Sequence, residues 1–150
     1  MFCSDLLDAH DPAWYPQVMR KKDVRWKQRF SNFTKALSQF EEAVGQDTHV
    51  RLEQEGLLQR FEYTFEVAWK CLQDLLQERG LVDIRGPKPV LEQAFQDGLI
   101  VDGVLWMEML RARNEASHMY DEKVFLRIYA QAKTKFVQPL RDLKIKLESL

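Results

Sequence analysis

The fold class of this chain is decided by one stretch, Trp26-Lys-Gln-Arg-Phe30-Ser-Asn-Phe33-Thr-Lys-Ala-Leu37-Ser-Gln-Phe40-Glu-Glu-Ala-Val44. Its large apolar residues are separated alternately by four and three positions, which places them on one face of an α-helix. The spacing predicts a helix over about residues 24–45, which ends at Gly45. Because a helix with one apolar face must bury that face, we expect partner helices elsewhere in the chain.

The same spacing recurs directly after Gly45. Apolar residues between Leu58 and Leu75 predict a second long helix from about 49 to 79, which ends at Gly80. Asp47 or Thr48 is available to cap its start. Gly56 inside this helix is either a weak point or a place where another backbone comes close.

The second half of the chain predicts three more helices. Residues 86–98 begin with prolines and end in glycine, which is typical of a short helix. The apolar residues between 105 and 110 predict a fourth helix. Asp121 can cap a last helix, which we expect Pro139 to kink. Since no segment alternates like a strand, we predict an all-α fold, an up-and-down bundle of four main helices with one additional short helix.

The first 22 residues differ from the rest. The run Asp11-Pro12-Ala-Trp14-Tyr15-Pro16 is expected not to continue a helix, and its two aromatic residues are expected to pack on the bundle or on a neighbour. Met19, which precedes Arg-Lys-Lys-Asp, offers an alternative translation start. We therefore predict an N-terminal extension, residues 1–22, and one helical domain, residues 23–150.

Composition indicates a soluble globular protein. The chain is 45% hydrophobic and 30% charged with a net charge of −1, so any binding to nucleic acid or membrane needs a local patch. Six basic residues between 20 and 29 form either a solvated helix face or a ridge for RNA or an acidic partner. The two cysteines are far apart, and no apolar run approaches the roughly 20 residues of a membrane span. We expect a cytoplasmic protein without membrane contact.

Several kinds of catalytic motif are missing from the sequence. It has no Gly-rich phosphate loop, no Asp-x-Asp pair for magnesium and no His/Cys cluster with zinc spacing. We therefore expect no metal site and no cofactor. A nucleotidyltransferase or metal-dependent nuclease is not expected to be complete within this chain.

One polar run, Arg113-Asn-Glu-Ala-Ser-His118-Met-Tyr120, suggests chemistry. It could be merely a polar helix end. Metal-free RNA cleavage needs a proton-transfer group, which His118 can supply, and a cation for the phosphate charge, which Arg113 can supply. In a continuous helix these two residues lie roughly 140° apart. They could converge if the helix breaks near Ser117, or if two copies meet across a dimer axis.

Three longer stretches carry a resemblance to a known family. Residues 59–70 (QRFEYTFEVAWK), 87–100 (PKPVLEQAFQDGLI) and 102–122 (DGVLWMEMLRARNEASHMYDE) resemble the nucleotidyltransferase substrate-binding protein family, and the Arg-Asn-x3-His-x-Tyr run resembles its HepT-like branch of the HEPN superfamily. The resemblance covers about residues 22–149. It departs from the family pattern at Glu115-Ala116. It implies a dimerising helical bundle encoded beside a small nucleotidyltransferase.

The resemblance supports two hypotheses about function. In the favoured one, the chain is the helical substrate-binding partner of a minimal nucleotidyltransferase. In the alternative, it is a HepT-like metal-independent ribonuclease toxin, which the partner neutralises by adding nucleotide to Tyr120. Both use one surface for RNA or nucleotide, and its expected residues are the catalytic pair Arg113 and His118 and the substrate-binding residues Asn114, Ser117, Tyr120 and Trp106.

Four more residues near the polar run have structural interpretations. Asn114 shares a helix face with His118 and could orient its imidazole. Trp106 could line the site, although packing is favoured. Glu62 and Glu66 could pair with basic residues of the first helix, and they are given no catalytic role.

Overall fold

The computed structural model describes residues 14–150, with side chains from residue 25 onward. In chain order the helices are α2 (Trp14–Val44), α3 (Arg51–Glu78), α4 (Pro87–Gln96), α5 (Gly103–Asn114), the 3-10 helix η1 (Glu115–His118), α6 (Glu122–Thr134) and α7 (Val137–Glu148). No strand occurs in this part of the chain. The all-α prediction is confirmed: α2, α3, α5 and the α6–α7 pair form the four main parts of the bundle, and α4 is the additional short helix.

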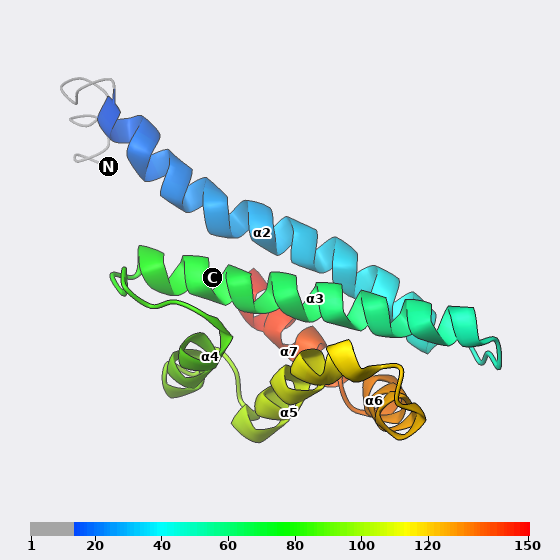
Figure 1. Cartoon of the computed structure of the whole chain (residues 1–150). Helices are drawn as coiled ribbons and strands as arrows, with labels where there is room; N and C mark the ends of the chain where they lie inside the picture. Colours follow the sequence, from blue (N-terminus) through cyan, green and yellow to red (C-terminus); the bar gives the residue numbers. More distant parts are fainter. Residues whose placement is uncertain (1–13) are drawn as a thin grey trace.

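The two longest helices, α2 and α3, lie side by side and run antiparallel (Figure 1). Their apolar stripes face each other, as the spacing predicts, and Phe40 of α2 packs against Phe61 of α3 with ring centroids 5.9 Å apart. Near the other end, Arg29 Nε donates to Asp74 Oδ2 over 2.6 Å. α4, α5 and α6 lie along the side of α3 that faces away from α2 (Figure 1), whereas α7 also packs against α2.

The start of α2 corrects the sequence analysis. The helix begins at Trp14 and passes through Pro16 and the predicted boundary between residues 22 and 23. Pro16 is its third residue, a position at which a backbone N–H would have no intrahelical acceptor, so the missing N–H of proline costs no hydrogen bond there. The predicted packing of the Trp14 and Tyr15 side chains falls outside the described side chains.

The last helix is broken and not merely kinked. It separates into α6 and α7 at Lys135 and Phe136, three residues before the predicted kink at Pro139. A proline clashes with the carbonyl four residues before it and cannot donate to that carbonyl, which explains a break at Lys135. The break lets Phe136 enter the core, where it stacks on Phe61 at 4.8 Å between centroids.

Helix ends agree with the sequence in part. Asp121 caps α6 by accepting hydrogen bonds from the backbone of Lys123 and Val124, as predicted. For α3 the prediction is wrong, because the cap position is Val50. Thr48 instead accepts from the Val50 N–H at 3.1 Å. At Gly56 an added Cβ would meet nothing within 4 Å, so no other backbone approaches there.

Candidate functional site

The motif segment, residues 113–120, lies where α5 ends. α5 stops at Asn114, and the chain continues through the 3-10 helix Glu115–His118 and a turn into α6. A helix break, one of the two conditions considered for bringing Arg113 and His118 together, is therefore present, but it begins before Ser117. Tighter 3-10 winding changes the direction of the following side chains relative to a continuous α-helix.

Arg113 is held by hydrogen bonds. Its Nη2 donates to Glu66 Oε1 of α3 over 2.8 Å, and its Nη1 donates to Asn114 Oδ1 over 3.0 Å. Lys70 also approaches Glu66 Oε1, at 3.9 Å. The possible pairing of Glu66 with the first helix is not formed among the described residues, because the end of α5 reaches the half-buried side of α3 that carries Glu66.

A second carboxylate of α3 lies close to the same arginine. Burial raises the pKa of Glu62, and the positive charge of Arg113 acts in the opposite direction. Glu66 Oε2 is buried and has no hydrogen-bond partner among the described residues. The guanidinium group therefore lies close to two carboxylates of its own chain, Glu66 and Glu62, which are one helical turn apart on α3.

His118 and Tyr120 form the exposed part of the motif segment. The imidazole Nδ1 lies 3.4 Å from the Tyr120 hydroxyl, and the two rings meet edge to face with centroids 6.0 Å apart. Tyr120 is 83% exposed, and Ser117 is also exposed. An exposed phenol next to an imidazole can be reached by a second protein.

Within a single chain, Arg113 and His118, the predicted catalytic pair, are not linked. Within the described part of the chain, no hydrogen bond or ion pair links Arg113 to His118. Asn114 bonds to Arg113 and not to His118, so the predicted orienting contact is not formed. Convergence of Arg113 and His118 across a dimer axis stays a prediction.

The remaining candidates lie around α5. Glu115, the departure from the family pattern, forms an ion pair with Arg127 of α6. Trp106 is 1% exposed and packs on Phe65, with ring centroids 6.1 Å apart. It lies about 10 Å along the helix axis from Arg113, away from the motif segment. This burial agrees with the packing role that the sequence analysis favoured for Trp106.

Residues 14–150 contain neither a cluster of metal ligands nor a membrane-spanning helix. No group of three or more His, Cys, Asp or Glu side chains there could hold a metal ion. None of the helices there has the length and apolar character needed to cross a membrane.

Glu66 is the site residue whose partner the sequence did not reveal. Its position on α3, one turn from Glu62 and Lys70, was visible as a charged stripe. Its partner is 47 residues away, and pairing over that distance depends on how α5 packs on α3. A single sequence carries no signal for that contact.

Comparison with known proteins now identifies the family. Residues 28–149 match the family model described as "Nucleotidyltransferase substrate binding protein like". The chain belongs to this family. The match covers the described helices from within α2 to the end of α7.

One curated relative and two solved structures extend the comparison. A Haemophilus influenzae protein named "Probable ribonuclease HepT" is 31% identical over 93 residues, which cover 59% of this chain and 61% of the relative. The matched region thus spans less than two thirds of that relative. A crystal structure of a Thermus thermophilus protein has a TM-score of 0.70 at 29% identity, and the match covers 77% of this chain and 98% of that protein.

The second structure carries a functional description. It is a Haemophilus influenzae protein described as showing "the fold of a substrate binding domain of a nucleotidyltransferase". It has a TM-score of 0.61 and 25% identity, and the match covers 85% of this chain and 98% of that protein. The family and the fold expected from the sequence are therefore confirmed.

Proposed function

We propose that this chain is the substrate-binding subunit of a two-chain nucleotidyltransferase, acts in the cytoplasm, and works as a homodimer with a small catalytic partner. The observation that carries the proposal is the state of Arg113. Glu66 and Asn114 already bind its guanidinium group, while His118 faces Tyr120. Such a chain offers a polar surface for a partner or substrate, but it does not align a cation and a proton-transfer group.

Family membership and exposure support the same proposal. The family is named for substrate binding to nucleotidyltransferases. Ser117, His118 and Tyr120 are all exposed, so a second protein can reach them without local unfolding. The carboxylates that hold catalytic magnesium would then come from the partner chain.

The test is complex formation with the nucleotidyltransferase encoded in the neighbouring reading frame. We expect the two purified chains to elute together at micromolar concentration. His118→Ala should still bind, because it removes one exposed side chain, whereas Tyr120→Arg should weaken binding if the motif segment forms the contact. Separate elution of the two wild-type chains would refute the proposal.

A second function has its own support. The similarity to the Haemophilus influenzae protein named as a probable ribonuclease favours metal-independent RNA cleavage, with Arg113 and His118 as the catalytic pair. In that case a dimer would have to bring the two residues together, and nucleotide addition to Tyr120 would silence the enzyme. Expression of the chain alone would then arrest growth, and co-expression of the partner would restore it for wild type but not for Tyr120→Phe.

A further inference from the structure

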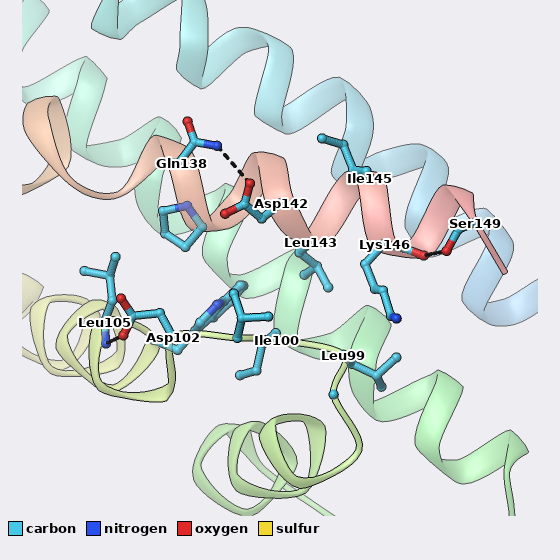
Figure 2. A pocket seen from close by; sticks show the side chains of 14 residues that line it. Leu99, Ile100, Asp102, Leu105, Gln138, Asp142, Leu143, Ile145, Lys146 and Ser149 are labelled. Atoms are coloured by element: carbon cyan, nitrogen blue, oxygen red, sulfur yellow. Dashed lines mark hydrogen bonds between the residues drawn. The ribbon is translucent and has the colours of Figure 1, made fainter.

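A cavity lies at the end of α5 that is remote from the motif segment. It has a volume of about 590 Å³, is partly open to solvent, and is lined by the α4–α5 connection, the start of α5, and α7 (Figure 2). Ligand sites in proteins commonly measure about 300–1,000 Å³. Gly103 and Arg113 are separated by roughly 15 Å along the axis of α5, so this cavity and the motif segment are different sites.

The floor of the cavity is apolar. It is made by buried side chains from three parts of the chain, namely Leu99, Ile100, Trp106, Pro139 and Leu143. Apart from the Trp106 indole N–H, these side chains carry no hydrogen-bonding group, and covering them with a flat apolar ring lowers the free energy.

Charged groups lie at opposite sides of this floor. Lys146 of α7 extends toward Leu99, and Asp102 lies on the other side of the cavity (Figure 2). The Lys146 ammonium group forms no hydrogen bond or ion pair within residues 25–150, in contrast to Lys144, which lies 3.7 Å from Glu148. Asp142, also in the lining, accepts from Gln138 over 2.8 Å.

This arrangement selects one class of ligand. An unpaired ammonium group beside an apolar floor favours a molecule with a flat apolar part and one anionic group. The carboxylates of Asp102 and Asp142 repel a second anionic group on their side and can accept hydrogen bonds from an amino group there. A single nucleotide meets these requirements.

We propose that the cavity binds a nucleoside monophosphate, with the base on the apolar floor and the phosphate against Lys146. This inference rests on the proposed function, because it identifies where the substrate-binding subunit holds a nucleotide. It also separates nucleotide binding from the motif segment, which remains free to contact the partner protein.

The test is a nuclear magnetic resonance titration of the ¹⁵N-labelled full chain with adenosine monophosphate in EDTA. We expect shifts in the amides of residues 99–102 and in the Trp106 indole. Lys146→Ala should weaken adenosine monophosphate binding about 10-fold, the loss of one charge-assisted hydrogen bond. The same variant should leave the weaker binding of adenosine unchanged. Lys144→Ala, on the same helix, should bind adenosine monophosphate like wild type.

Three outcomes would overturn the inference, and a fourth would overturn only the proposed function. An absence of shifts at the cavity, or equal affinity of Lys146→Ala and wild type, would show that no nucleotide phosphate binds there. Shifts confined to residues 113–120 would move the nucleotide to the motif segment and leave the proposed function standing. Cavity binding without any complex with the nucleotidyltransferase would refute the proposed function alone.

Discussion

The guanidinium group of Arg113 lies 2.8 Å from the carboxylate of Glu66, across the contact between α5 and α3. The two side chains are both about 70% shielded from solvent, since 32% and 27% of their surfaces remain exposed. Arg113, the cation expected to bind phosphate, is thus also the counter-ion of a carboxylate in its own chain. Any anion that approaches Arg113 must compete with Glu66.

The Arg113–Glu66 pair should contribute measurably to stability. Glu66→Gln removes the negative charge but keeps an oxygen acceptor, so we expect the free energy of unfolding to fall by about 1 kcal/mol. Glu55→Gln is the matched control on α3, because Glu55 forms an exposed pair with Arg51. Glu55→Gln should lower the free energy of unfolding by less than about 0.5 kcal/mol. Urea unfolding measures both, and equal losses would show that the Glu66 pair has no special role.

The Arg29–Asp74 ion pair, which joins α2 to α3, should contribute more to the free energy of unfolding than the Arg113–Glu66 pair. The Asp74 side chain is only 4% exposed, so Arg29→Ala leaves a buried carboxylate without its cation. We expect a loss of about 2 kcal/mol, reduced from the value for a fully buried pair because Arg29 is partly exposed. Arg25→Ala removes an exposed arginine from the same helix and should cost less than about 0.5 kcal/mol. Thermal or urea unfolding that ranks the two variants in the opposite order would contradict the assignment.

Cys71 should be inert in the folded protein. Burial raises the pKa of its thiol from 9.0 to about 12, with a smaller contribution from Asp74. In a Cys3→Ser background, a thiol reagent at pH 8 should react with Cys71 only after urea is added, since the thiolate is the reactive form. Fast labelling of the native protein would contradict this burial.

The same shift makes stability depend on pH. Below pH 9 both the folded and the unfolded chain keep the Cys71 proton, so the contribution of the buried neutral thiol to stability is fully present. Between pH 9 and about 12 the unfolded chain loses the proton first, and stability falls as pH rises. Cys71→Ala should therefore show a shallower loss of stability over this range than wild type.

Much of the fold could be predicted because it follows from local spacing. The apolar spacing from Trp26 to Val44 predicts a helix, and the prolines at the start of α4 predict where α4 begins. Both are local signals, and both elements are present in the structure. Pro16 and Pro139 were harder, because the effect of a proline depends on its position within a helix. Pro16 stands in a first turn and is tolerated, whereas Pro139 stands far enough into a helical run to break it at Lys135.

The candidate site was predictable as a segment but not as a set of contacts. The sequence located residues 113–120 and allowed either a continuous helix or a break near Ser117. It could not show that Arg113 bonds to Glu66, since ion pairs between helices depend on packing angles that no local pattern encodes. The expectation of Asn114 beside His118 assumed a continuous α-helix, and the 3-10 winding from Glu115 to His118 removed that geometry.

The proposed dimer predicts both a mass and a contact. Light scattering at micromolar concentration should give twice the 17.8 kDa of one chain. If the motif segments face a shared groove, Ser117→Cys in the Cys3→Ser background should form an interchain disulfide on mild oxidation. Ser38→Cys, an exposed serine on α2, is the control and should remain reduced. A monomer at every concentration would exclude the dimer, and crosslinking of the control alone would exclude the shared groove.

The central claim is that the motif segment of this chain is a binding surface and not an assembled ribonuclease site. The most direct measurement is the degradation of labelled RNA by the purified chain in EDTA, with wild type, Arg113→Ala and His118→Ala compared at equal concentration. A working proton-transfer group typically contributes about 10²–10⁴-fold to a rate. The account predicts that RNA remains intact with all three proteins. Cleavage by wild type that falls by this factor in His118→Ala and also falls in Arg113→Ala would contradict the account and establish the ribonuclease instead.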